Sequence, residues 1–252
     1  MSEAPHPRWA IHAVPPADHP LWQAGCRWLG RDPETGETFG PPAGLDEDRW
    51  RAVTTTPAHY GFHATLKPPF TLRSGTSPET LTERLAAFAA DRAPVALPVL
   101  AANWLGVFLA LRPIEPVPAI DTLAGDCVAA FDDLRAPLSA AEIQWREAAG
   151  LTPRERALLE TWGYPYVFEA FRFHYTLTDA SPAAQAPSIR DAIDMTFGKA
   201  LAATPPPCEL ALFHHGGDGP FRLIRRFRPS ATAHGAIMHR RCATNGTGQS
   251  RG

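Results

Sequence analysis

The sequence predicts an α+β fold with two pseudo-symmetric lobes, each with an antiparallel sheet and packed helices, and a cleft between the lobes. One observation is that a strand, a helix and a hairpin follow one another twice along the 252 residues. Another is that both series begin with the pattern Phe-His-x-Thr-Leu, at residues 62–66 and 173–177. The histidines are 111 positions apart and the hairpin turns, at Gly106 and Gly219, are 113 apart. This spacing indicates an internal duplication.

Proline and serine mark the elements of the first series. Alternating residue types predict a strand at residues 61–66, which Pro68 and Pro69 end. Ser77 followed by Pro78 is typical of a helix start, with a hydroxyl N-cap and proline at the first helical position. We also expect a strand at 9–14, a helix at 21–29, a mostly irregular stretch at 31–58, a helix from 78 to about 91 and hairpin strands at 95–102 and 107–112.

A helical insert at residues 117–162 separates the two series. Ser139 with Glu142, and Thr152 with Glu155, fit the capping box, in which hydroxyl and carboxylate satisfy each other's free backbone donors. Further along the chain we expect a strand at 171–178, a helix at 188–201 and hairpin strands at 208–214 and 221–227.

These elements predict a single domain over residues 1–229. Lobe 1 would span about residues 9–112 and lobe 2 about residues 168–229, with the insert between them. Residues 230–252 are rich in glycine, serine and asparagine and have no apolar periodicity, so we expect a disordered tail.

Composition limits the class of partner. A formal net charge of -2 and a pI near 6.5 give no global positive field for DNA, long RNA or an anionic membrane, so a small substrate is favoured. No signal-peptide profile and no membrane-spanning run is present, and we expect a cytoplasmic protein. The widely spaced cysteines predict reduced thiols, mostly in the core: Cys26, Cys127, Cys208 and Cys242.

Each repeated pattern places polar groups together on one face of a strand. Side chains alternate along a strand, so His63 and Thr65 share a face, together with Lys67 if the strand continues past it. In the second copy Arg172, His174 and Thr176 project from one face. Each strand can therefore offer an imidazole, a hydroxyl and a cation to the space between the lobes.

Two imidazoles suit the cleavage of a phosphodiester. One group must take a proton from the attacking hydroxyl or water while another gives a proton to the leaving oxygen. An unperturbed pKa of ~6.5 keeps both protonation states of histidine accessible near neutrality. The threonine hydroxyls and a lysine or arginine would hold the non-bridging oxygens. This chemistry requires no metal and no cofactor.

The two patterns also resemble a known family. Residues 60–67, Tyr-Gly-Phe-His-Ala-Thr-Leu-Lys, and residues 171–178, Phe-Arg-Phe-His-Tyr-Thr-Leu-Thr, are similar to the paired signatures of the two-histidine phosphoesterase superfamily. More narrowly, the chain resembles a poorly characterised branch often encoded with carbon–phosphorus lyase genes for phosphonate use. That resemblance covers about residues 9–227, including the stretches at 28–32 and 162–167. It implies His63 and His174 as acid and base, with Thr65 and Thr176 binding phosphate.

Other interpretations of the same residues stay open. Alternating aromatic and polar residues also describe any half-buried strand, although duplication gives no structural reason to keep histidine twice. Tyr60 could stack on a base or sugar, or could pack a loop against the core. Lys67 and Arg172 could be surface cations. His59 with His63, and His214 with His215, could suggest zinc, but no carboxylate or thiolate completes a set.

Three functions remain in competition. We favour an enzyme acting on a small cyclic phosphate or phosphodiester, in phosphonate metabolism. An RNA 2′,3′-cyclic phosphodiesterase or ligase-like enzyme would need a strand-binding groove lined by the basic stretch Arg222, Arg225, Arg226 and Arg228. A non-catalytic phosphate or nucleotide sensor is the third. The sequence leaves the oligomeric state, the acid and base assignment and the role of the insert open.

Overall fold

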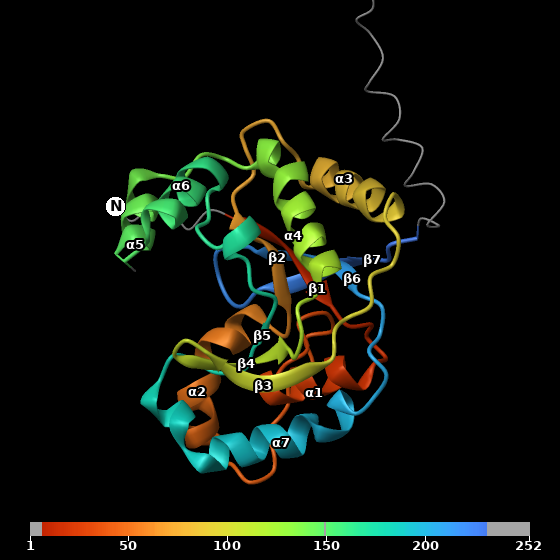
Figure 1. The fold of residues 1–252 in the computed structure, drawn as a ribbon, viewed down its shortest axis with the longest axis vertical. Coiled ribbons are helices and arrows are strands. Elements are labelled where there is room, and N and C mark those ends of the chain that lie inside the picture. Colours follow the sequence, from red (N-terminus) through yellow and green to blue (C-terminus); the bar gives the residue numbers. More distant parts are fainter. Residues whose placement is uncertain (1–6, 149, 231–252) are drawn as a thin grey trace, which may run out of the picture.

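Two antiparallel sheets form the interior of the molecule. The computed structural model describes residues 7–148 and 150–230 (Figure 1). The four-stranded sheet has the order β2-β1-β6-β7, with β1 at Arg8–Val14, β2 at Ala64–Phe70, β6 at Glu209–His215 and β7 at Arg222–Phe227. The three-stranded sheet has the order β3-β4-β5, with β3 at Leu100–Leu105, β4 at Phe108–Pro113 and β5 at Tyr175–Thr176. The predicted α+β class is confirmed.

Each sheet takes strands from both halves of the chain. The hairpin β3–β4 follows β2 in sequence but pairs through β4 with β5, and the hairpin β6–β7 pairs through β6 with β1, the neighbour of β2. Residues 9–112 and 168–229 therefore do not each hold a sheet of their own, and that part of the expected lobes is wrong. The prediction assumed that neighbouring elements pair, whereas here the two hairpins are exchanged.

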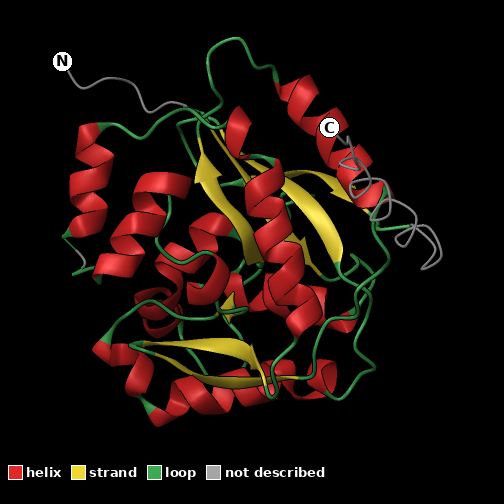
Figure 2. Cartoon of the chain, turned by 45° about the horizontal axis from the view of Figure 1, so that its top comes forward, coloured by secondary structure: helices red, strands yellow, loops and turns green. Residues whose placement is uncertain are grey.

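Helices cover the outer faces of the sheets, as Figure 2 shows. In Figure 1, α1, α2 and α7 lie with the three-stranded sheet in the lower half, and α3 and α4 lie with the four-stranded sheet above. Their bounds are Pro20–Leu29 for α1, Glu47–Tyr60 for α2, Pro78–Ala90 for α3, Pro118–Ala130 for α4 and Pro187–Leu201 for α7.

The insert continues after α4 with two capped helices, α5 at Ala140–Glu147 and α6 at Pro153–Trp162. Both predicted capping boxes are confirmed. The side chains of Ser139 and Thr152 each accept from the third helical N–H, and the backbone N–H of each cap residue donates to the carboxylate of Glu142 or Glu155. Three short 3-10 turns complete the order: η1 at Asp132–Leu134, η2 at Phe168–Ala170 and η3 at Pro182–Gln185.

The aromatic rings of the two signatures pack directly on each other. The ring of Phe62, just before β2, stacks on Tyr175 of β5 with centroids 4.7 Å apart and planes 12° apart, and neither side chain is exposed. Phe197 of α7 and Trp22 of α1 close around Phe62 at 6.1 and 6.5 Å. One hydrophobic cluster consequently joins both sheets.

Two indole N–H groups tie the helices to the end of β5. Trp28 Nε1 donates to the carbonyl oxygen of Leu177 at 2.7 Å, and Trp50 Nε1 donates to that of Trp28 at 2.6 Å. Both side chains are completely buried. Both donors are thus satisfied inside the core. The Trp50 bond holds α2 against α1, and the Trp28 bond holds α1 against the segment of the second signature.

The stretch 31–58 is not mostly irregular as expected, because α2 begins within it. Asp46 caps this helix by accepting from Arg49 N, and Trp50 and Val53 are buried one turn apart. The run of threonines before Pro57 is typical of a loop, but burial of Trp50 outweighs that weak local preference.

The second signature strand is shorter than expected, with only Tyr175 and Thr176 in the ladder. Leu177 N and Thr178 N both donate to the carbonyl oxygen of Leu109, and the buried Thr178 hydroxyl accepts from Leu109 N. The chain thus leaves the sheet after Thr176, and Thr178 points into the core.

Several smaller expectations concern single residues and the termini. Cys26, Cys127 and Cys208 are buried free thiols, and burial raises the pKa of each, as predicted for reduced core cysteines. Cys242 and nearly all of the expected tail, residues 231–252, lie outside the described residues, as do residues 1–6. In the part of the chain that the structure describes, no helix has the length and apolar character needed to cross a membrane.

Packing against Phe62 makes Gly25 of α1 intolerant of a side chain. A Cβ at this position would lie 2.1 Å from the Phe62 ring. We expect Gly25→Ala to lower the free energy of unfolding by ~1–3 kcal/mol, because overpacking displaces the ring. Urea denaturation of the variant measures this change.

Gly198→Ala in α7 is the matched control. Apart from its chain neighbours and the backbone of its own helix, a Cβ at this helical glycine would have no atom within 4 Å, and alanine favours a helix. Its stability should be unchanged or raised. Equal loss in both variants would contradict a special role for the contact between Gly25 and Phe62.

Candidate active site

Both signature histidines are held by the same local hydrogen bond. His63 Nδ1 lies 2.8 Å from the carbonyl oxygen of Gly61, and His174 Nδ1 lies 2.7 Å from that of Arg172, in each case two residues earlier. A carbonyl oxygen can only accept, so Nδ1 carries the hydrogen in both rings. Each neutral imidazole therefore keeps its lone pair on Nε2, where it can take a proton.

The two signatures meet in space. Strands β2 and β5 are in contact, and the rings of Phe62 and Tyr175 stack at this junction. His63 and His174, each adjacent to one of these rings in sequence, are both half-buried. A charge on His174 lowers the pKa of His63.

Burial dominates the electrostatics of both histidines. It lowers the pKa of His63 to about 4, opposed by the Gly61 carbonyl and assisted by the charges of His174 and Arg31. Burial likewise lowers the pKa of His174, opposed by its hydrogen bond to Arg172 and assisted by the Arg112 guanidinium. Both rings are consequently neutral near pH 7 before an anion binds.

Thr65 and Thr176 lie two residues beyond the histidines and are half-buried. Along extended backbone such residues point the same way, so each hydroxyl accompanies its imidazole. Thr65 pairs with His12 of β1, and Thr176 pairs with Ala110 of β4. The geometry thus groups an imidazole and a hydroxyl at each signature.

Lys67 does not share the face of Thr65, and this expectation is wrong. Thr65 pairs with His12 but Lys67 pairs with Ile11, because the register shifts between these two positions of β1. Successive residues of β1 point to opposite faces, so Thr65 and Lys67 do as well. The Lys67 ammonium is instead buried, 3.2 Å from the carbonyl oxygen of Val128 and 3.5 Å from Asp132. It has a structural role beneath α4.

Tyr60 and Arg172, the other two predicted binding residues, have different surroundings. Tyr60 is half-buried, its ring lies 6.0 Å from that of His63, and it stacks on Phe221 at 4.9 Å. Arg172 is exposed, and its guanidinium donates to the carbonyl oxygens of Glu169 and Phe171. Tyr60 accordingly borders His63, whereas backbone carbonyls of its own segment hold Arg172.

Sequence reasoning missed three groups beside the histidines. The ring of His12 of β1 packs against that of His63 with centroids 3.9 Å apart. Arg31 donates to the carbonyl oxygens of Ala58, His59 and Phe221, and its charge acts on His63. Arg112 of β4 acts in the same way on His174. Of these three, only His12 could have been noticed in the sequence, as a histidine within an otherwise apolar strand. Arg31 and Arg112 could not, because they act on the histidines only after distant segments pair.

Neither the zinc site nor the RNA-binding groove considered above has the side chains that it would need. Within residues 7–148 and 150–230, no cluster of three or more histidine, cysteine or acidic side chains could hold a metal ion. In the basic stretch, Arg226 pairs with Glu34 and Glu209, and Arg228 also pairs with Glu209. Half of the arginines proposed to line an RNA groove are therefore engaged in ion pairs.

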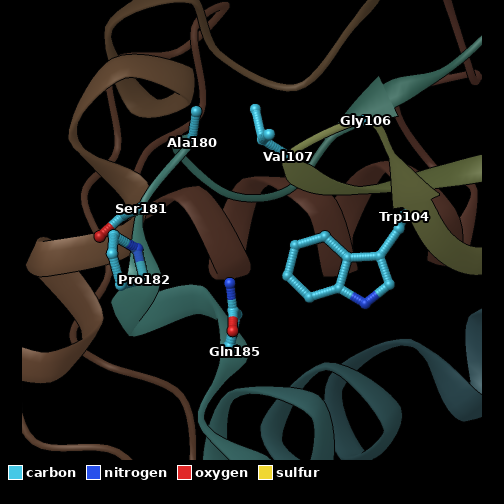
Figure 3. Close-up of a pocket in the computed structure, with 7 residues that line it drawn as sticks. All are labelled: Trp104, Gly106, Val107, Ala180, Ser181, Pro182 and Gln185. Carbon is cyan, nitrogen blue, oxygen red and sulfur yellow. The ribbon is translucent and has the colours of Figure 1, made fainter.

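A cavity of about 560 Å³ is lined by neither histidine. Figure 3 shows it at the turn of the β3–β4 hairpin, with Trp104 on one side, Ser181 and Pro182 on the other, and Gln185 between them. The remaining lining residues are Gly106, Val107 and Ala180. None of the predicted site residues lines it.

The family described as "Protein of unknown function (DUF1045)" matches residues 65–222. The chain belongs to this family. Membership in DUF1045 agrees with the expected poorly characterised branch of the two-histidine phosphoesterases. The matched range begins at Thr65 and includes His174, so His63 lies just before it.

Two curated relatives of this DUF1045 chain share the name ribose 1,5-bisphosphate phosphokinase PhnN. The protein from Janthinobacterium sp. (strain Marseille) is 42% identical over 203 residues, 79% of this chain and 45% of the relative. That from Laribacter hongkongensis (strain HLHK9) is 36% identical over 230 residues, 86% of this chain and 51% of the relative. The chain spans about half the length of the curated relatives it matches.

Solved structures of E. coli LigT also align with the chain. The complex with 3′-AMP covers 89% of this chain and 98% of LigT, at 18% identity and a TM-score of 0.38. The complex with NADP+ covers 90% of this chain and 100% of LigT, at 16% identity and the same TM-score.

The depressed histidine pKa values make stability pH-dependent. Burial is the main cause of a lowered pKa at His12, His59, His63, His174 and His214. Between about pH 6.5 and pH 4 the unfolded chain binds protons that the folded chain excludes, so the free energy of unfolding falls as the pH falls through this window. Stability from this source is complete above about pH 6.5.

Urea denaturation at successive pH values measures the effect. His63→Gln removes one of the histidines with a lowered pKa. The free energy of unfolding of this variant should therefore fall less steeply as the pH is lowered, and the contribution of His63 is on the order of 1–3 kcal/mol. Identical pH dependence in this variant and the parent would contradict the buried, neutral state of His63.

Proposed function

We propose that this protein is a metal-independent phosphoesterase that opens a small cyclic phosphate or cleaves a small phosphodiester, in phosphonate metabolism. The observation that carries the proposal is the matched geometry of His63 and His174. Both rings have Nδ1 held by a backbone carbonyl, which leaves Nε2 for proton transfer, and each histidine directly precedes one of two strands that are in contact. A pair of such imidazoles can remove one proton and supply another in a single displacement.

In the proposed reaction, the neutral Nε2 of one histidine takes a proton from a water molecule as its oxygen bonds to phosphorus. The bond from phosphorus to the leaving oxygen breaks, and the second histidine, protonated at Nε2, gives its proton to that oxygen. The product is a ring-opened phosphomonoester. Exchange of one proton between each imidazole and solvent restores the starting state.

Binding of the phosphate group prepares this state. A phosphate anion favours the imidazolium form, so it raises the pKa of a nearby histidine that burial has lowered. Thr65 and Thr176 donate their hydroxyl hydrogens to the non-bridging oxygens, where negative charge increases in the transition state. The Arg112 guanidinium, which acts electrostatically on His174, adds a positive charge on that side.

Ribose phosphates are the first substrate class to test. The curated relatives, of which this chain matches about half, are named for a kinase acting on ribose 1,5-bisphosphate. A protein that contains both parts would bring two phosphoryl-transfer steps on phosphorylated ribose together. The near-neutral charge of the chain also favours a small substrate over a long RNA.

The decisive assay incubates the purified protein with ribose 1,2-cyclic phosphate, 2′,3′-cyclic nucleotides and a short cyclic-phosphate RNA, each with and without chelator. We expect turnover of a small cyclic phosphate that chelator does not reduce. His63→Ala and His174→Ala should each lower kcat by ~10²–10⁴-fold, because each removes one proton-transfer step.

His59→Ala provides a matched histidine control, since His59 is exposed and lies outside the pair. It should retain activity. Turnover that disappears with chelator, or that survives both signature substitutions, would refute the mechanism. Binding of cyclic phosphates without any turnover would identify a sensor instead.

A further inference from the structure

One position breaks the pseudo-symmetry of the two signatures. The residue paired with Thr65 is His12, and the residue paired with Thr176 is Ala110. Residues paired in this way on adjacent strands place their Cβ atoms ~5 Å apart and on the same face. Equivalent places beside the two signatures therefore hold an imidazole in one case and a methyl group in the other.

The His12 ring is completely buried and covers the ring of His63. The centroids of the His12 and His63 rings are 3.9 Å apart, and their planes are tilted by 35°. The Phe213 ring makes an edge contact with His12 at a centroid distance of 4.8 Å. Neither ring nitrogen of His12 has a hydrogen-bond partner among the described residues. His12 consequently acts on His63 through the face of a neutral ring and not by orienting a hydrogen bond.

His174 has a different environment. The ring of Phe108 lies beside it at 5.7 Å, and the Arg112 charge acts on it. Around His63, by contrast, the groups are His12 from β1, Tyr60 from α2, Phe213 from β6 and the charges of Arg31 and His174. The two histidines thus share the same local hydrogen bond but have different neighbours.

We propose that His12 is a positioning residue that makes His63 the general base and leaves His174 as the general acid. This inference rests on the proposed phosphoesterase function. The His12 face excludes water from one side of His63 and keeps that imidazole uncharged until it receives the proton of the attacking water. His174, which has no ring packed as closely against it, takes up a proton when the anionic phosphate arrives and passes it to the leaving oxygen.

The charge state of His12 itself agrees with this role. Burial first, and the charge of His63 second, lower the pKa of His12 well below its ordinary value. A ring that remains neutral can pack closely on His63 without placing a second positive charge beside it. Burying an imidazole without a partner costs ~1–3 kcal/mol, so the side chain is a poor choice for filling space alone.

The test compares His12→Ala with His12→Phe by following the His63 ring in histidine NMR titrations, which need no turnover. Removing the ring admits water, so His12→Ala should raise the pKa of His63 by ~1 unit or more towards its ordinary value. His12→Phe retains the packing face and should leave that pKa low. If His12→Ala does not fold, His12→Val provides the smaller side chain in a strand-favouring form.

The pH dependence of kcat/KM then assigns the roles. The low-pH limb of this profile reports the pKa of the essential base of the free enzyme. In His12→Ala the limb should shift to higher pH together with the His63 pKa, and in His12→Phe it should lie where it does in the parent protein. Phe108→Ala, which removes the ring beside His174, is the control and should leave the His63 pKa and this limb unchanged.

Each outcome separates this inference from the proposed function. An unmoved His63 pKa in His12→Ala, or movement of the high-pH limb instead, would overturn the role of His12 while turnover itself continued. Absence of turnover in the parent protein would refute the phosphoesterase proposal and the base assignment with it, whatever the titration showed.

Discussion

The stack of Phe62 on Tyr175 is the contact on which the rest of the structure depends. These rings belong to the two signatures themselves, next to His63 and His174, so the segments that contain the imidazoles also contain the packing that joins them. Around the stack lie Phe197 and Trp22, and beyond it Trp28 anchors the end of β5. Displacing either ring would therefore alter the core and the separation of the histidines together.

A duplicated backbone does not require duplicated chemistry. The carbonyls of Gly61 and Arg172 give both imidazoles the same hydrogen-bonded Nδ1, which the repeated sequence pattern encodes locally. Differences arise from the strands alongside, where His12 and Arg112 are contributed by segments outside the two signatures. The two repeated segments consequently give the histidines the same local geometry, and the neighbouring strands give them different surroundings.

Local patterns were the parts of the sequence that predicted structure well. Both capping boxes and the hairpin at the end of the domain follow from residues a few positions apart. The first hairpin was predicted in the right place, but its leading strand is Leu100–Leu105 and not residues 95–102, so the turn follows Leu105. Features that depend on distant pairing were not predictable. The register shift that turns Lys67 away is decided by β1, α2 forms because Trp50 is buried, and the hairpins are exchanged between series that each looked self-contained.

That exchange also has a consequence for how the chain folds. Strand β1 pairs with β6, for example at Trp9 and His214, so the central pairing of the four-stranded sheet joins the two ends of the domain. Contacts between such distant segments are slow to form, because a long loop must close before they contribute any stability. A nascent chain lacking β6 has β1 and β2 without their central neighbour. Folding of the sheet must then wait for nearly the whole domain to leave the ribosome, and the incomplete chain is exposed to aggregation until then.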